Sequence, residues 1–204
     1  MKIPNLYANL FLTSFFALLF CTSVNADQES YRIDDSHSFA NWTIRHVASK
    51  TSGTFSDVKG NIMIDPNKLA NSSVTATINL LSVNSSHAKR DAHIKKEEYL
   101  DVAKFSEMTF VSSKVEASSN TNGVITGVFK LHGVAKQISF PFKVLGFGVD
   151  PWGGYRIGLE AHTSIKASDF GFSWPLTPKA PVGDEIEITL LIEGVKLPEE
   201  LPIK

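Results

Sequence analysis

Cysteine is almost absent from this chain, which has one, Cys21, among 204 residues. A single cysteine excludes an internal disulfide framework and zinc sites built from several thiolates. An excess of one charge is also lacking, since 20 Lys and Arg residues face 21 Asp and Glu residues. Nucleic-acid-binding proteins normally carry a clear basic excess, so this balance argues against a nucleic-acid partner.

Long hydrophobic runs are lacking as well. The apolar stretch near the N-terminus, residues 10–20, is shorter than the roughly 20 residues that cross a bilayer. A lysine precedes it, and the small residue Ala26 stands just before the first acid, Asp27. This layout is typical of a cleavable secretory signal. We predict that residues 1–26 are removed as a signal peptide and that residues 27–204 form the exported domain.

Two alternatives to a cleaved signal peptide are less compatible with the N-terminal sequence. An uncleaved membrane anchor is disfavoured by the short apolar run. A lipoprotein anchored at Cys21 is disfavoured because Phe20 precedes it, where lipidated cysteines normally follow a small residue. Cleavage after Ala26 would leave a domain without any thiol, with 19 basic and 21 acidic residues. Such a domain must be held together by its core, which a chain of roughly 150 residues or more can do.

After residue 30, apolar residues recur with a period of two, which is the main signal of half-buried β-strands. Eight strands are expected, at residues 31–47, 53–65, 73–83, 107–116, 124–132, 136–148, 155–165 and 184–196. Turn-forming sequences such as Asp65-Pro66-Asn67 separate them. Long antiparallel strands with one apolar face must stack as a sandwich or close into a barrel, and closure leaves no exposed edge. Eight strands would enclose room for side chains or one slender ligand.

The alternation stops between Ser85 and Lys104, where helix-forming residues predominate. Ser85 or Ser86 is a suitable N-cap, so we predict a short helical insertion between the third and fourth strands. Loops of this length are commonly lids or binding elements. We therefore expect this segment, with Arg90, Asp91 and His93, to cover one end of a barrel.

The stretch from His37 to His46 shows which side chains share a strand face. Residues two apart lie on the same face of a strand. The face formed by Ala40, Trp42, Ile44 and His46 therefore combines apolar side chains with an imidazole. His46 could be a buried core histidine or a polar group near the mouth of a cavity. A metal site is disfavoured because no second histidine or cysteine lies at a fixed local spacing.

Motifs of well-known enzymes are missing. The sequence has no Gly-x-Ser-x-Gly elbow and no glycine-rich phosphate loop, so Asp169-Phe170-Gly171 does not indicate a kinase. Ser, His and Asp are present, but a catalytic triad is defined by geometry. We predict that the protein is not an enzyme and that it needs no metal or cofactor.

Several short motifs, taken in order, resemble the YceI-like family. They are Tyr31-x-Ile33-Asp34-x-x-His37-Ser38, then His46, Gly53-x-Phe55 with Gly60, Arg90-Asp91-x-His93, Gly127, His132-Gly133-Val134 and Asp169-Phe170-Gly171. Each motif alone is weak, whereas their order and spacing together are fairly specific. The resemblance covers nearly the whole predicted mature chain.

The resemblance implies an all-β fold, an eight-stranded antiparallel lipocalin-like barrel with an internal tunnel. It also implies a bacterial periplasmic protein that binds a polyisoprenoid lipid as its ligand. Together with the strand faces, the resemblance indicates ten candidate ligand-binding residues. They are Ala40, Trp42, Ile44, His46, Arg90, Asp91, Phe129, Phe140, Phe142 and Phe170. The chain departs from the family at Lys166, where an arginine is frequent, and lysine lacks the planar fork of arginine.

Two functions are therefore compared. The first is a carrier that sequesters a long apolar chain, such as a polyisoprenoid or isoprenoid quinone, with His46 near its polar head. The second is a structural or interaction module whose barrel is packed solidly by Trp42, Phe129, Phe140, Phe142 and the isoleucines. Partners beyond the apolar ligand stay open, including a second copy of the chain and a transient contact with a membrane.

Overall fold

The computed structural model describes residues 28–174 and 180–198. The predicted signal peptide and its cleavage site at Ala26 lie outside these residues. Among the described residues, no helix combines the length and the apolar character needed to cross a bilayer.

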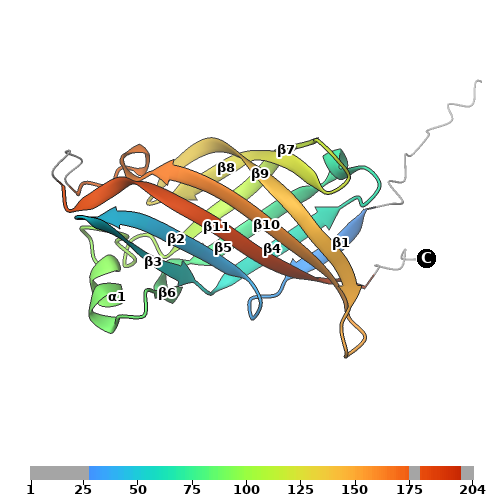
Figure 1. The fold of residues 1–204 in the computed structure, drawn as a ribbon, viewed down its shortest axis with the longest axis horizontal. Helices are drawn as coiled ribbons and strands as arrows, with labels where there is room; N and C mark the ends of the chain where they lie inside the picture. Colours follow the sequence, from blue (N-terminus) through green and yellow to red (C-terminus); the bar gives the residue numbers. More distant parts are fainter. Residues whose placement is uncertain (1–27, 175–179, 199–204) are drawn as a thin grey trace, which may run out of the picture.

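The described chain is almost entirely β-structure (Figure 1). Its strands are β1 (Glu29–Ile33), β2 (Phe39–His46), β3 (Ser49–Phe55), β4 (Val58–Ile64), β5 (Ser73–Asn79), β6 (Val83–Asn84), β7 (Glu107–Ala117), β8 (Asn122–Leu131), β9 (Val134–Val149), β10 (Tyr155–Lys166) and β11 (Val182–Lys196). One α-helix, α1 (Ala88–Ile94), and three short 3₁₀ helices, η1 (Leu69–Asn71), η2 (Leu80–Ser82) and η3 (Ala167–Phe170), complete these elements.

Eight of the strands close into an antiparallel barrel. Their order is β1-β4-β5-β7-β8-β9-β10-β11, and β1 pairs with β11 to complete the ring. The remaining strands, β2, β3 and β6, continue the sheet from β11 as a side branch. The predicted all-β, eight-stranded antiparallel barrel with one short helix is therefore confirmed, with three additional strands.

The first predicted strand, residues 31–47, is wrong as a single element. A turn separates β1 from β2, because the Asp34 carboxylate accepts hydrogen bonds from the backbone N–H and the hydroxyl of Ser36. Both strands then pair with the same strand, β11, one after the other along its length. The predicted strand at 53–65 is likewise divided, into β3 and β4, by two residues after Phe55.

The helical insertion begins later than predicted. The N-cap of α1 is His87, whose side chain accepts a hydrogen bond from the N–H of Arg90, rather than Ser85 or Ser86. The preceding strand is also shorter than expected. β5 ends at Asn79 because the Asn79 side chain caps the 3₁₀ turn η2.

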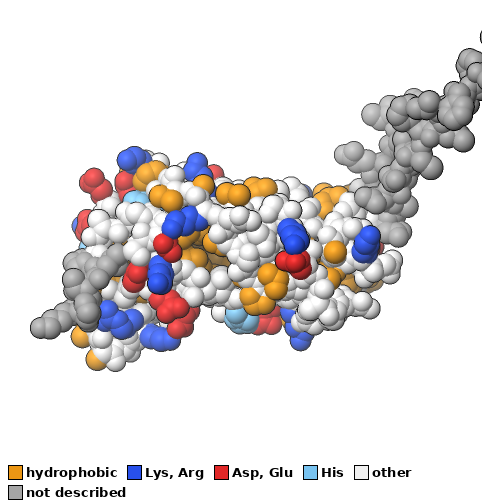
Figure 2. Space-filling model, turned by 90° about the horizontal axis from the view of Figure 1, so that it is seen from above, with side chains coloured by type: hydrophobic (Ala, Val, Ile, Leu, Met, Phe, Trp, Pro, Cys, Tyr) orange, Lys and Arg blue, Asp and Glu red, His pale blue; other side chains and the backbone are white. Residues whose placement is uncertain are grey.

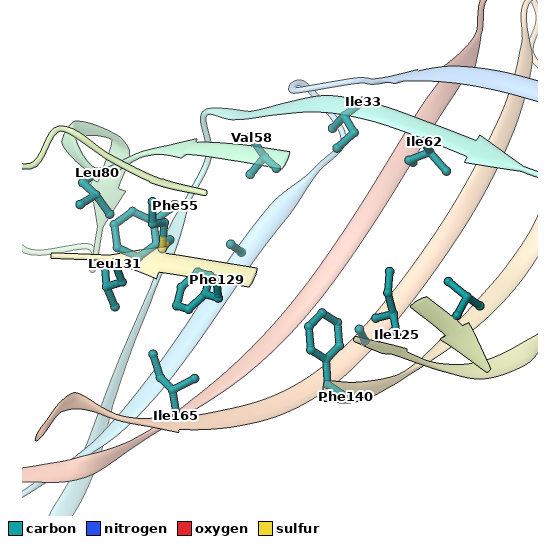
Figure 3. Close-up of a cluster of buried hydrophobic side chains, with 14 of the residues drawn as sticks. Ile33, Phe55, Val58, Ile62, Leu80, Ile125, Phe129, Leu131, Phe140 and Ile165 are labelled. Carbon is teal, nitrogen blue, oxygen red and sulfur yellow. The ribbon is translucent and has the colours of Figure 1, made fainter. Parts of the chain in front are cut away.

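The period-two faces do point inward, as predicted. Figure 3 shows part of the buried cluster, with Phe129 between the group that contains Phe55 and Leu131 and the group that contains Phe140. On the outside, Figure 2 shows Lys and Arg side chains interspersed with Asp and Glu on the displayed face. The barrel thus has an apolar interior and, on that face, a mixed-charge exterior.

Candidate functional site

The interior of the barrel is not completely filled by side chains. Cavity 1, of about 320 Å³, lies at the α1 end, and cavity 2, of about 150 Å³, lies beyond it toward the end formed by β1 and the β9–β10 hairpin. A solidly packed barrel does not match this arrangement. The two cavities are the candidate functional site.

Cavity 1 is bounded by the predicted face of β2. Ala40, Trp42, Ile44 and His46 all line it, and His46 is exposed at the outer end of the strand. Its other lining residues are Asn41, Thr51, Phe55, Leu80, Arg90, His93, Ile94, Tyr99, Leu100, Met108, Phe129, Leu131, Ile165, Phe172, Trp174, Pro181, Val182, Ile186 and Ile188. Several polar or amphipathic side chains of this set come from α1 and the segment after it.

Cavity 2 is lined almost wholly by apolar side chains. Phe140 and Phe142 of β9 lie here, facing Leu159 and Ala161 of the neighbouring strand β10. Polar side chains in its wall are confined to Ser72, Ser73, Glu160 and Thr163. Both cavities are therefore largely apolar, and the few polar groups are more numerous in cavity 1.

The two cavities are neighbours and share part of their lining. Five residues line both cavities: Ala40, Met108, Phe129, Ile165 and Ile188. They come from five different strands, and we call this shared set of side chains the waist. A ligand that occupied both cavities would have to pass these side chains.

Trp42 carries an unusual polar group for a cavity wall. Its indole Nε1 is buried and has no hydrogen-bond partner among the described residues. The ring lies flat over Gly53 on the paired strand β3, where an added Cβ would come 2.5 Å from a ring carbon. Glycine at position 53 is therefore required by the close approach of the indole. A buried donor without a partner costs about 1–3 kcal/mol, which a ligand acceptor could offset.

Arg90 and Asp91 have different surroundings although they are adjacent. Arg90 lines cavity 1, and its Nε donates to the Ser85 hydroxyl at 2.7 Å. Asp91 lines neither cavity; it accepts hydrogen bonds from the backbone N–H and the hydroxyl of Ser85. Burial raises the pKa of Asp91, but the Ser85 hydrogen bonds outweigh it and leave the pKa below its usual value. Asp91 thus holds the start of the helical segment in place.

An aromatic cluster at the α1 end was missed by the sequence analysis. His132 stacks on Phe172 with ring centroids 4.6 Å apart, and Phe172 stacks on Trp174 at 4.7 Å. Tyr99 packs against Trp174 at 5.4 Å and against His93 at 4.9 Å. These rings come from three segments distant in sequence, around residues 93–99, 132 and 172–174, so no local pattern could have revealed them. All of them except His132 line cavity 1.

Phe170 lies outside both cavity walls. Its side chain is 1 % exposed and packs edge-on against Phe129, with ring centroids 5.4 Å apart. The neighbouring Asp169 pairs with Lys136 at 2.8 Å. Phe170 therefore supports the waist residue Phe129 from behind. Lys166, the departure from the family pattern, is exposed at the end of β10.

A network of charged groups occupies the end of the barrel opposite α1. The Arg156 guanidinium donates to Asp34 at 2.6 Å and to Asp150 at 2.7 Å, and it also contacts Glu193. Burial raises the pKa of Asp34, but hydrogen bonds from Ser36, Arg156 and His37 outweigh it and place the pKa well below its usual value. Hydrogen bonds from Arg156 to the carboxylates of Asp34, Asp150 and Glu193 in turn raise the pKa of Arg156.

The same network contains a set of atoms spaced like metal ligands. Ligand atoms of Asp34, His37 and Glu193 lie within 4.8 Å of one another. The Arg156 guanidinium contacts both carboxylates, so a cation of the protein itself already balances them. Ser36 and Asp34 both approach the same nitrogen of His37, Nδ1. A catalytic triad needs the acid and the nucleophile on different ring nitrogens, so these three residues do not form one.

Comparisons with known proteins agree with this architecture. Residues 31–194 match the YceI-like domain family. Protein YceI of Salmonella agona strain SL483 is 39 % identical over 191 residues, which cover 92 % of this chain and 97 % of that protein.

Two solved structures share the fold. BcnA of Burkholderia cenocepacia superposes with a TM-score of 0.71 at 21 % identity, covering 79 % of this chain and 98 % of that chain. A polyisoprenoid binding domain from Saccharophagus degradans, implicated in plant cell wall breakdown, superposes with a TM-score of 0.64 at 17 % identity. The match covers 83 % of this chain and 99 % of that domain.

Proposed function

Because this chain belongs to the YceI-like family, we propose that it is a non-enzymatic lipid-binding protein that sequesters or carries a long apolar chain inside its barrel. The observation that supports the proposal is the pair of largely apolar cavities that share the waist residues. Burial of each CH₂ group contributes about 0.8 kcal/mol, so a long hydrocarbon chain is strongly favoured to leave water for such a space. The polyisoprenoid named for the Saccharophagus degradans domain supports the same ligand class.

The shape of the space favours an extended ligand over a compact one. The two cavities lie one after the other along the barrel and meet only at the waist residues, such as Ala40 and Phe129. A compact metabolite would fill one of them and leave the other empty. An isoprenoid chain could thread the waist and occupy both as one continuous binding space.

The orientation of the ligand follows from the difference in lining. We place the polar head in cavity 1, near Trp42, His46 and Arg90, because the polar side chains of the site gather there. A small rotation of the Trp42 ring would bring its buried, unpartnered indole N–H within reach of an oxygen of the head group. The apolar tail would lie in cavity 2 against Phe140 and Phe142.

Export to the periplasm is the second part of the proposal. It rests on the signal-peptide layout of residues 1–26, with Ala26 at the cleavage position. Expression of the full chain in a Gram-negative host should yield a periplasmic protein. Its intact mass should correspond to a chain that begins at Asp27. A retained or acylated Cys21 would contradict this localisation.

Mass spectrometry of organic extracts tests the lipid-binding proposal. The mature protein should be purified without detergent and extracted, alongside a similarly exported protein of unrelated fold from the same host. We expect an isoprenoid lipid in near-stoichiometric amount from this protein alone. The proposal fails if no lipid is extracted and the lipid-free protein also takes up no added polyprenol or quinone.

A further inference from the structure

The hairpin between β9 and β10 ends in an exposed apolar tip, which we define as residues 147–155. Figure 1 shows that this hairpin projects from the end of the barrel opposite α1. Trp152 is 82 % exposed and Val149 is 73 % exposed, and Phe147 and Tyr155 beside them are also exposed. Large apolar side chains gathered at one protruding point commonly mark an interaction site.

The tip has a defined shape although it is exposed. The carboxylate of Asp150 accepts hydrogen bonds from the backbone N–H groups of Trp152 at 2.9 Å and Gly154 at 2.8 Å. The backbone N–H of Asp150 donates to the Gly154 carbonyl at 2.8 Å. Gly153 has a φ of +86°, which favours glycine at this point of the turn. Trp152 is therefore held at the apex by hydrogen bonds of the turn itself.

The tip also exposes almost no charge. Its single charged residue is Asp150, whose side chain is 9 % exposed and pairs with Arg156 at 2.7 Å. A bilayer would therefore meet a surface of aromatic and aliphatic groups, with its one carboxylate already paired. Tryptophan and tyrosine favour the interface between the headgroups and the acyl chains.

The small size of the tip argues against a protein partner. A stable protein interface takes about 800 Å² and roughly 20–30 residues from each side. The tip has nine residues, residues 147–155, at the end of a two-stranded ribbon. A bilayer requires only a few apolar side chains, inserted by about 5–10 Å.

The apolar face of the tip continues into the barrel. Tyr155, Ile157 and Leu159 alternate along β10, so they share one face. Ile157 is fully buried and Leu159 lines cavity 2. On β9, Phe147 pairs with Ile157 and stacks on Tyr155 with ring centroids 6.3 Å apart. A row of apolar side chains therefore connects the exposed tip with the wall of cavity 2.

We propose that the β9–β10 tip is a membrane-docking element that inserts Trp152 and Val149 into the interface of a lipid bilayer. Docking would bring the cavity 2 end of the barrel against the membrane and leave the α1 end facing the aqueous phase. The contact uses apolar insertion, so it needs neither anionic lipid nor bound cargo. It can therefore be tested on lipid-free protein, independently of the proposed function.

The test is flotation of the mature protein with vesicles of pure phosphatidylcholine, which carry no net charge. We expect binding that resists added salt, and Trp152→Ser should weaken it by about fivefold or more through loss of the interfacial aromatic group. Val128→Ser, which removes an exposed apolar side chain from β8 outside the tip, is the matched control and should bind like the parent. Circular dichroism checks that both variants are folded.

Quenching by brominated phosphatidylcholine locates the inserted residue. Emission should be quenched in the parent protein, and this quenching should be lost in Trp152→Phe, which keeps an aromatic side chain while Trp42 and Trp174 remain as reporters. Equal binding by the parent and Trp152→Ser would overturn the proposal. It would also be overturned if the parent did not bind, or if sedimentation showed that the tip instead mediates a dimer lost in Trp152→Ser.

Discussion

The two ends of the barrel differ in where their polar groups lie. At the α1 end, cavity 1 opens among His46, Arg90 and a cluster of aromatic rings, and a buried indole N–H stands without a protein partner. At the other end, cavity 2 is almost wholly apolar, and Asp34, Asp150 and Glu193 beyond it are already paired with Arg156. Among the described residues, the buried side-chain polar atom that has no partner lies at the α1 end. The binding space therefore has a direction.

The largest effect is expected at the waist, where the two ends meet. Ala40→Phe would add a ring to a buried position that lines both cavities. We expect it to abolish co-purified long-chain lipid, at a cost of up to about 1–3 kcal/mol in stability from overpacking. Lipid extraction and chemical denaturation measure the two effects. Ala135→Phe, at an exposed position of β9, is the control and should keep the lipid. Full lipid occupancy in folded Ala40→Phe would contradict a single continuous space.

The ion-pair network at the cavity 2 end should determine how stability depends on pH. The pKa of Asp34 is lowered in the folded protein, so its contribution is present above the unfolded pKa of about 3.9 and is lost as the pH falls below that value. Arg156→Gln should cost about 1–3 kcal/mol at neutral pH and flatten this acid dependence. Denaturation curves from pH 7 to pH 2 test this. Lys50→Gln, which removes an exposed pair with Glu187, should change stability by less than about 1 kcal/mol. An unchanged acid profile in Arg156→Gln would show that the network does not stabilise this end.

A smaller effect should separate the head from the tail. Trp42→Phe removes the indole N–H and retains an aromatic ring, so it should weaken binding of a polyprenol or quinone by about 2- to 10-fold, the value of one hydrogen bond. Binding of an isoprenoid hydrocarbon without oxygen should change much less, which controls for the altered shape. Competition with a fluorescent lipid measures both ligands. Equal losses for the two ligands would mean that Trp42 acts by packing alone.

The smallest effect is expected at the departure from the family pattern. Lys166 is exposed at the end of β10 and lines neither cavity. Lys166→Arg should therefore change stability and lipid content within about 0.5 kcal/mol, as is usual for surface substitutions. Thermal unfolding and lipid extraction check this. A clear gain in either quantity would show that a planar guanidinium organises the loop that contains Phe170.

Strand faces were predictable from the sequence because a period of two is a local property. Ala40, Trp42, Ile44 and His46 line one cavity, as the alternation along this stretch indicated. Strand breaks were less predictable. The division of residues 31–47 depends on pairing of both halves with β11, which lies more than a hundred residues away.

The site itself was predictable only in part, for the same physical reason. The face of β2 lines cavity 1, whereas Asp91 and Phe170 support the site from outside its walls. The partners of Arg156 lie 6, 37 and 122 residues from it in the sequence, so no local pattern identifies them. The cavities depend on the volumes of side chains from many strands. A cue was available in Arg156, a lone basic residue that directly follows a Gly-Gly turn and an aromatic.

The tandem pairing along β11 has a mechanical consequence. Beyond cavity 2, the pairing of β1 with β11 closes a ring of hydrogen-bonded strands, which can widen there only by breaking a ladder. Around cavity 1 part of the wall is the branch β2-β3-β6, and β6 pairs only with β3 among the described strands. A branch attached along one edge can bend while its ladders stay intact. We therefore expect the α1 end of the barrel to deform more easily than the opposite end. Under the proposed function, the α1 end could then accept lipid head groups of different size, while the space for the tail would keep a constant width.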